Sequence, residues 1–251
     1  MDARAPAISV DSVSVDFGKV RAVDKVSFEI AQGERLVLMG RSGCGKSTLL
    51  KAVGGFIAPS EGVVLVAGRK AKSPGPDRMV VWQDDQQLFP WKTIESNVAY
   101  PMELAGVPKG EARSRALQWL DRVGLTRALG HFPHQLSGGM RQRVSIARGF
   151  AANPAVLLMD EPFSALDALT RSKLQDELIK LQESAGTSVL FVSHDVAEAA
   201  RVGCRVIVLE PHPGRVKAVV KGGVEGAERA IRDLIYETEP PAEELEGEDH
   251  A

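Results

Sequence analysis

The chain is organised around Leu36-Val37-Leu38-Met39-Gly40-Arg41-Ser42-Gly43-Cys44-Gly45-Lys46-Ser47. The first four residues are continuously apolar, which predicts a strand buried on both faces of a parallel sheet. From Gly40 to Ser47 the spacing is G-x-x-x-x-G-K-[ST], and residues 47–53 can form the helix that follows. A strand, a glycine-rich loop and a helix in this order predict a phosphate-binding loop within an α/β domain.

The residue types of this loop explain how it would hold phosphate groups. Glycines let backbone N–H groups converge on phosphate oxygens, and the N-terminus of the following helix favours negative charge. Lys46 can reach the β- and γ-phosphates of a nucleotide, and the Ser47 hydroxyl can ligate Mg²⁺. A chance glycine-rich turn would not explain the apolar strand before the loop or the helix after it.

Two acids, Asp160 and Glu161, follow a second apolar strand at 155–159. At the carboxyl end of a strand, Asp160 can hold Mg²⁺ directly or through water, and Glu161 is placed to polarise an attacking water. Gln83 and His194 also directly follow predicted strands, and such strand ends converge on a ligand crevice. A solvated acidic turn is the alternative for the two acids, but the phosphate loop earlier in the chain favours a functional pair.

Composition narrows the class of protein. Apolar residues make up 44% of the chain and charged residues 25%, which is ordinary for a globular protein. The formal net charge of −2 predicts no nucleic-acid partner, and no apolar run is long enough to span a membrane. The N-terminus lacks the apolar core of a secretory signal.

The two cysteines, Cys44 and Cys204, make no disulfide framework, which favours a reduced cytoplasmic protein. Cys44 lies within the phosphate loop, where two interpretations stay open. It is simply a small residue that the loop tolerates, or Lys46 and the helix N-terminus lower the pKa of its thiol. In the second case a maleimide would inactivate the protein and bound nucleotide would protect it.

The rest of the chain divides into strand-like, helical and acidic segments. Apolar patterns predict further strands at 8–15, 26–30, 62–66, 78–82, 188–192 and 205–209. Between 93 and 130 the composition is helical, and helices are expected at 112–123, 138–152 and 169–183. We expect a short helix at 227–236, followed by an acidic, disordered tail that cannot bury enough apolar surface to fold alone.

The segment Leu136-Ser137-Gly138-Gly139-Met140-Arg141-Gln142-Arg143 resembles the signature motif of ATP-binding cassette (ABC) proteins. Other motifs of that family occur in the family's order along residues 8–220. The resemblance implies that Phe17 stacks on adenine, where tyrosine is commoner in the family. It also implies that ATP is bound by Gly40, Arg41, Ser42, Gly43, Cys44, Gly45, Lys46, Ser47 and Thr48.

Residue roles are implied by the same resemblance. Catalysis would involve Glu161, His194, Gln83 and Lys46, and Mg²⁺ would be held by Ser47, Gln83 and Asp160. Ser164-Ala165-Leu166-Asp167 matches the D-loop, with Asp167 as its acid. In ABC proteins the signature contacts the ATP of the opposite subunit, which assigns that contact here to Leu136, Ser137, Gly138, Gly139 and Met140.

The fold implied by the resemblance is α/β: a P-loop NTPase of ABC type with a mixed sheet core, a small antiparallel β subdomain and an inserted helical subdomain. The ABC domain would cover residues 1–222, with the helical subdomain at about 88–152, and 223–251 would form the acidic tail. Because the signature faces a partner's phosphate loop, two copies would meet head to tail as a homodimer around two ATP molecules.

Leu88-Phe89-Pro90-Trp91 resembles importer ATPases for nitrate, sulfonates and taurine. The resemblance implies a subunit at the cytoplasmic face of the inner membrane that energises a permease, which a solute-binding protein supplies. Phe89 and Trp91 then either contact the permease or pack inside the helical subdomain. Trp82, Arg41 and Asp84-Asp85 depart from the group's usual residues, which weakens any assignment of substrate.

Two other classes of function are weighed against the importer. The first is a soluble ABC ATPase in DNA repair or translation, but the chain has no coiled-coil insertion, no second cassette and no basic charge. The second is a regulator that binds ATP without hydrolysing it, and the presence of both Glu161 and His194 argues against this class.

Overall fold

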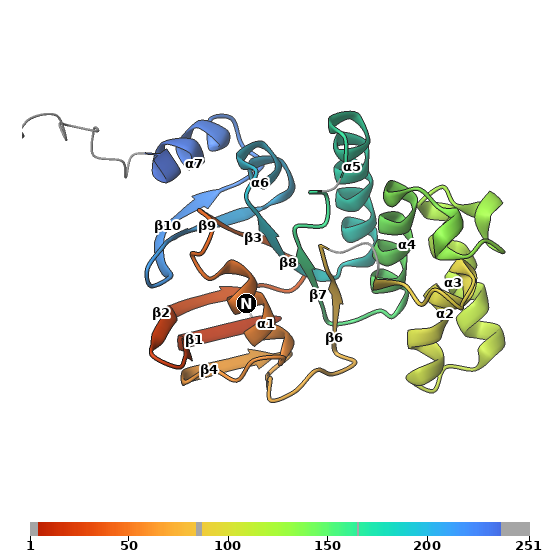
Figure 1. The fold of residues 1–251 in the computed structure, drawn as a ribbon, viewed down its shortest axis with the longest axis horizontal. Helices are drawn as coiled ribbons and strands as arrows, with labels where there is room; N and C mark the ends of the chain where they lie inside the picture. The colour runs from red at the N-terminus through yellow and green to blue at the C-terminus, as the bar shows by residue number, and fades with distance from the viewer. Residues whose placement is uncertain (1–4, 84–86, 165, 237–251) are drawn as a thin grey trace, which may run out of the picture.

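The computed structural model describes residues 5–83, 87–164 and 166–236, and its centre is a mixed six-stranded sheet (Figure 1). The strand order is β10-β9-β3-β8-β7-β6, and only β10 runs antiparallel to its neighbour. The strands are β3 (Arg35–Gly40), β6 (Arg78–Val81), β7 (Val156–Asp160), β8 (Ser188–Ser193), β9 (Arg205–Glu210) and β10 (Arg215–Lys221).

A second, antiparallel sheet packs against this core and has the order β2-β1-β4-β5. Its strands are β1 (Ile8–Phe17), β2 (Val20–Ile30), β4 (Glu61–Val66) and β5 (Arg69–Lys70). Helix α1 (Lys46–Gly54) follows the phosphate loop and contacts strands of both sheets. The two sheets confirm the expected mixed core and antiparallel β subdomain.

The central strands are buried on both faces, as their continuous apolar sequences predict. Leu36 and Leu38 of β3 belong to the hydrophobic cluster shared with α1 and the antiparallel sheet. Val37 and Met39 belong to the cluster on the other face, which the longer helices cover. Side chains that alternate along one strand therefore contribute to two separate hydrophobic cores. The polar residues lie at the ends of the strands, along the edge of the sheet.

The helical subdomain consists of α2 (Ile94–Leu104), α3 (Lys109–Arg122) and α4 (Gly138–Ala151), which contact one another. Short 3₁₀ turns at Thr126–Ala128 and Pro133–Gln135 connect α3 to α4. Helix α5 (Ala168–Ala185) lies beside α4 (Figure 1), and it also contacts α6 (Val196–Val202). No helix within the described ranges combines the length and the apolar character needed to cross a membrane.

Several elements differ from the sequence-based expectation. Strand β2 begins at Val20 rather than near residue 26, and β10 and the short helix α6 (Val196–Val202) have no counterpart in the prediction. Both missed elements are short or half-exposed, so their apolar periodicity is weak.

The C-terminal helix α7 (Ala227–Tyr236) forms where it is expected, but it belongs to the folded body. Ile231 and Ile235 are buried, the Lys217 ammonium donates to the Leu234 carbonyl, and α7 contacts α6, β9 and β10. The packed domain therefore extends to Tyr236 instead of ending at 222. The acidic segment 237–251 lies outside the described residues.

Candidate nucleotide-binding site

The phosphate loop forms one wall of a cleft of about 570 Å³ at the carboxyl edge of the central sheet. The ammonium of Lys46 donates to the carbonyl oxygens of Gly40 at 2.7 Å and Arg41 at 3.1 Å, so the lysine reaches back along the loop. The described residues that line the cleft are Ala22, Ser42, Gly43, Gly45, Lys46, Ser47, Thr48, Glu161 and His194.

Strand β2 supports the loop from behind, and glycine is required at two contacts. Gly45 has φ +88°, and a Cβ there would lie 2.7 Å from a methyl carbon of Val23. A Cβ on Gly214 would lie 2.2 Å from the carbonyl oxygen of Cys44. Gly214 also donates its backbone N–H to the Ala22 carbonyl at 2.9 Å. The loop is therefore held between β2 and the β9–β10 turn with no room for side chains.

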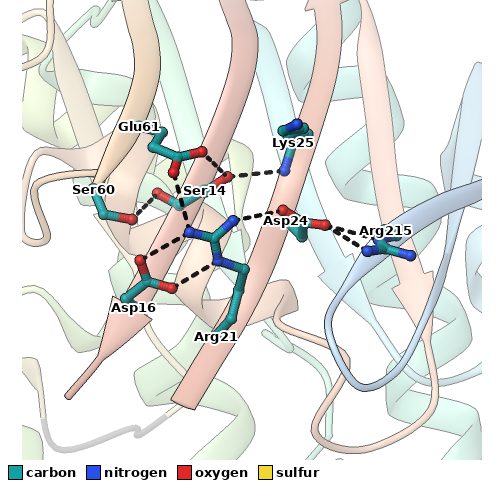
Figure 2. Close-up of polar contacts among 8 residues, drawn as sticks. All are labelled: Ser14, Asp16, Arg21, Asp24, Lys25, Ser60, Glu61 and Arg215. Carbon is teal, nitrogen blue, oxygen red and sulfur yellow. Dashed lines mark hydrogen bonds and ion pairs between the residues drawn. The ribbon is translucent and has the colours of Figure 1, made fainter. Parts of the chain in front are cut away.

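An ion-pair network fixes this part of β2 (Figure 2). The Arg21 guanidinium contacts Asp16 at 2.9 Å, Asp24 at 2.9 Å and Glu61 at 3.1 Å, which joins three antiparallel strands. Asp24 also accepts from Arg215 of β10 at 2.6 Å, so it joins the antiparallel sheet to the central sheet. Hydrogen bonds from Arg215 and Arg21 lower the pKa of Asp24, and a hydrogen bond from Arg21 lowers that of Asp16.

Ser47 and Asp160 meet at the start of α1. The Ser47 hydroxyl donates to a carboxylate oxygen of Asp160 at 3.0 Å, and Asp160 is buried. Burial raises the pKa of Asp160, and the Ser47 hydrogen bond opposes that effect. A hydroxyl and a carboxylate side by side at a phosphate loop are the oxygen ligands that Mg²⁺ prefers, so this pair fits that ion.

Glu161 and His194 face each other across the carboxyl ends of β7 and β8. Nδ1 of His194 lies 2.9 Å from Oε2 of Glu161. The Glu161 N–H donates to the Val192 carbonyl at 3.1 Å, and Glu161 has φ +44°. A non-glycine residue in this left-handed region is uncommon and concentrates at functional sites, so the strained backbone coincides with the predicted catalytic acid.

The structure brings together only some of the predicted site residues. Lys46, Ser47, Asp160, Glu161 and His194 converge on or beside the cleft. Phe17 is half exposed at the end of β1, Gln83 is exposed after β6, and neither lines the cleft. Asp84 and Asp85, which follow Gln83, lie outside the described residues.

The signature segment also lies apart from the cleft. Helices α1 and α4 both contact β6 but belong to opposite faces of the sheet. The exposed Ser137 caps α4 by accepting the Met140 N–H at 3.3 Å. A Cβ on Gly139 would lie 3.4 Å from Thr170 at the start of α5, so the signature is next to the D-loop rather than to its own phosphate loop.

Of the two interpretations of Cys44, the structure favours a small residue that the loop tolerates. Its side chain is fully buried, and burial raises the pKa of the thiol more than the nearby Lys46 lowers it. Sequence proximity to a cation suggested the opposite because it does not reveal that Sγ points into the core beneath Gly40. Cys44 is therefore a small packing residue.

Sequence reasoning missed four residues of this region. Ala22 lines the cleft from a strand that was expected to start later. Arg171, Asp195 and the buried Glu198 surround a small second cavity behind Glu161 and His194. Asp195 directly follows His194 and could have been found from that motif, whereas the roles of Arg171 and Glu198 depend on contacts made only in the fold.

Comparison with known proteins identifies the family. Residues 23–164 match the model of the ABC transporter family. The chain is 48% identical over 216 residues to the taurine import ATP-binding protein TauB of Rhizobium johnstonii. The aligned residues cover 84% of this chain and 82% of that protein.

Solved structures agree with this match. One is the dimeric structure of a post-hydrolysis state of the ATP-binding cassette MJ0796 bound to ADP and Pi, with 34% identity, a TM-score of 0.72, and coverage of 85% of this chain and 98% of that one. Another is cbiO1 from Clostridium perfringens, part of the ABC transporter complex cbiONQ, with 26% identity, a TM-score of 0.77, and coverage of 85% and 88%. The chain thus belongs to the ABC transporter family and is an ABC-type ATPase.

Proposed function

We propose that this chain is the ATP-hydrolysing subunit of an importer, and that it works as a head-to-tail homodimer. The observation that carries the proposal is the cleft in which Lys46, Glu161 and His194 converge. The taurine import function in the name of the Rhizobium relative supports import of a small anionic solute such as taurine, another sulfonate or nitrate.

The chemistry follows from the placement of these groups. Glu161 orients and deprotonates the water that attacks the γ-phosphate, because its carboxylate lines the cleft opposite the phosphate loop. His194 is within hydrogen-bond distance of that carboxylate and holds it in place. Lys46 and the loop N–H groups bind the phosphate oxygens, and the exposed aromatic ring of Phe17 stacks on adenine.

Ser47 and Asp160 would hold Mg²⁺, and Gln83 would be the third residue to hold it. When bound, this ion offsets the negative charge that develops on the phosphate oxygens. Gln83 is exposed at the end of β6, next to the helical subdomain, and it is free to approach the cleft when that subdomain moves.

A second copy supplies the signature segment that one chain does not bring to its own phosphate loop. Leu136, Ser137, Gly138, Gly139 and Met140 lie away from their own phosphate loop, at the N-terminus of α4, where backbone N–H groups favour an anion. In a head-to-tail pair, this segment of one copy meets the γ-phosphate bound by the other. Asp167 lies close by as the N-cap of α5 and accepts the Thr170 N–H at 3.0 Å.

An apolar groove of about 500 Å³ beside β6 and α2 suits a membrane permease. Phe89 packs edge-on against Tyr100 with ring centroids 5.1 Å apart, while Trp91 and Leu104 are 71% and 70% exposed. Arg148 closes the groove floor, and burial lowers its pKa to about 10. A short amphipathic helix of the permease, at the cytoplasmic face of the membrane, fits such a surface.

Neither alternative class is favoured. The match to transport ATPases over most of the chain speaks against a role in DNA repair or translation. The presence of Glu161 and His194 at contact distance speaks against a regulator that only binds ATP.

Substitution Glu161→Gln tests the catalytic part of the proposal. Loss of the general base should lower kcat by about 10²–10⁴-fold while ATP binding persists. The variant should elute as a dimer with trapped ATP in gel filtration, whereas Glu183→Gln, on the exposed face of α5, should behave as wild type. Near-normal turnover of Glu161→Gln would remove Glu161 as the base.

Substitution Leu104→Glu tests the permease surface. It should abolish co-purification with the membrane permease and leave the ATPase activity of the isolated chain unchanged. Val219→Glu is a matched control, because Val219 is also an exposed apolar residue but lies on β10, away from the groove. Equal capture of permease by both variants would place the docking surface elsewhere.

A further inference from the structure

Behind Glu161 and His194 lies a second cavity of about 30 Å³. It shares these two residues with the ATP cleft but is otherwise formed by other side chains. Its lining residues are Glu161, Phe163, Ser164, Arg171, His194, Asp195 and Glu198. Arg171 is the only lysine or arginine among these described lining residues, and it faces a region with three carboxylates.

Arg171 joins two loops that approach the cavity from different parts of the chain. One guanidinium nitrogen donates to the carboxylate of Asp195 at 3.1 Å. Another donates to the backbone carbonyl of Leu166 in the D-loop at 2.9 Å. Asp195 directly follows His194, so one side chain on α5 contacts both the D-loop and the segment that carries His194.

The His194 side of this connection is rigid. Asp195 caps α6 by accepting the Glu198 N–H at 3.1 Å, and its own N–H donates to the Ser193 hydroxyl at 3.0 Å. The buried Glu198 carboxylate accepts from the Ser193 hydroxyl and from Gln175 at 2.9 Å. Gln175 lies one helical turn after Arg171 on α5, so the helix holds the segment at two points.

The D-loop side leads back to Glu161. The Ser164 hydroxyl donates to the Glu161 carbonyl at 2.9 Å, and the Ser164 N–H donates to the same carbonyl at 3.2 Å. Asp167 caps α5, the helix that carries Arg171. Contacts therefore link this region to Glu161 through Ser164, and to the residue after His194 through Arg171.

We propose that Arg171 is a positioning residue that sets the contact between His194 and Glu161 according to the position of the D-loop. The inference rests on the proposed function, in which the D-loop lies at the interface with the second copy. With the D-loop in its present position, Arg171 holds Asp195 so that His194 lies 2.9 Å from the carboxylate of Glu161. Displacement of Leu166 by the second copy moves Asp195 through Arg171 and thereby changes this contact.

The matched pair of substitutions is Arg171→Met and Arg201→Met. Arg201 also links α5 to α6, since it donates to Ser172 at 2.8 Å and to Asp176 at 2.7 Å, but it touches neither loop. Arg171→Met should lower kcat by about tenfold and leave the Kd for ATP in the Glu161→Gln background within about twofold. Arg201→Met should change neither quantity.

A double-mutant cycle with His194→Ala separates positioning from general stability. If Arg171 acts through His194, Arg171→Met should cause no further loss of kcat in a chain that already carries His194→Ala. If Arg171 only stabilises the fold, Arg171→Met should lower the kcat of the His194→Ala chain by the same factor by which it lowers the kcat of wild type. This outcome would overturn the inference. Arg171→Lys, which keeps the positive charge but has one nitrogen in place of the guanidinium fork, should recover part of the rate.

A second variant covers the case in which Arg171→Met does not fold. Asp195→Asn keeps the oxygen that caps α6 but removes the charge that Arg171 contacts, and its loss of kcat should likewise vanish in the His194→Ala background. Additive losses would overturn the inference. Normal turnover by Glu161→Gln would instead refute the proposed function, so the two failures are distinguishable.

Discussion

Nδ1 of His194 lies 2.9 Å from Oε2 of Glu161, and this contact joins the ends of two adjacent parallel strands. The His194 side chain is 62% exposed, whereas that of Glu161 is 18% exposed. The histidine is therefore the more exposed member of the pair, and the acid is the more buried one. In the proposed function the histidine orients the acid rather than acting as a second base.

Substitution His194→Ala should lower kcat by about 10- to 100-fold, because a hydrogen bond to a charged group contributes about 1.5–3 kcal/mol. The Kd for ATP should change little, since phosphate binding depends on the loop around Lys46. Single-turnover hydrolysis and equilibrium nucleotide binding measure the two effects separately. His134→Ala, at an exposed position in the helical subdomain, is the control. A large rise in Kd with unchanged kcat would contradict this role.

Mixing two inactive chains tests the head-to-tail arrangement. Lys46→Ala disables the phosphate loop, and Ser137→Arg blocks the signature with bulk and charge. A mixed dimer contains one site with both defects and one site with neither, so single-turnover hydrolysis should reappear at one site per dimer. Neither variant alone should show it. Absence of activity in proven mixed dimers would mean that each chain completes its own site.

Maleimide labelling tests the buried state of Cys44. In the native protein only the exposed Cys204 should react, and ATPase activity should remain unchanged after that reaction. Unfolding in denaturant should expose both thiols. The measurement is mass spectrometry of the labelled chain with and without denaturant, with Cys204→Ser as the control. Rapid native labelling of Cys44 would show that the loop opens.

Acid should weaken the ion pairs that Asp24 forms with Arg21 and Arg215. Hydrogen bonds from Arg215 and Arg21 lower the pKa of Asp24 in the folded state below its ordinary value in an unfolded chain, which is about 3.9. The ion pairs therefore stabilise the fold above that pH, and the contribution is lost as pH falls through the folded pKa. Asp24→Asn should be less stable than wild type at pH 7, and the difference should shrink below about pH 4.

Urea unfolding at several pH values measures this difference. Asp233→Asn is the control, because Asp233 forms only a loose 3.9 Å ion pair within the exposed face of α7. A difference between Asp24→Asn and wild type that stays constant down to pH 3 would mean that the charge of Asp24 does not contribute to stability.

Local sequence patterns predicted the strands and the loop that form the ATP cleft, because the burial of a strand depends on its own apolar residues. Four apolar residues before Gly40 can only be buried on both faces, and the acids after β7 must then lie at the sheet edge. The same logic placed His194 after β8. The family resemblance supplied the mixed topology and the helical subdomain, which the structural comparisons confirm.

What the sequence could not predict depends on contacts between distant segments. The burial of Cys44 is set by the hydrophobic cluster that forms beneath Gly40, and the role of Arg21 depends on Asp16, Asp24 and Glu61 meeting in space. Strand β10 is half exposed, so its pattern is too weak to recognise. Arg171 looked like an ordinary polar residue of a helix until the fold brought Asp195 beside it.

The packing of α7 against α6 and β10 places the end of the described chain at one extremity of the molecule, with α2 and α3 at the other (Figure 1). A dye attached just after Tyr236 is therefore carried by the core, and a second dye on α3 is carried by the helical subdomain. Energy transfer between these two dyes would report any change in distance between the core and the helical subdomain during single turnovers, with neither label in the cleft or the groove.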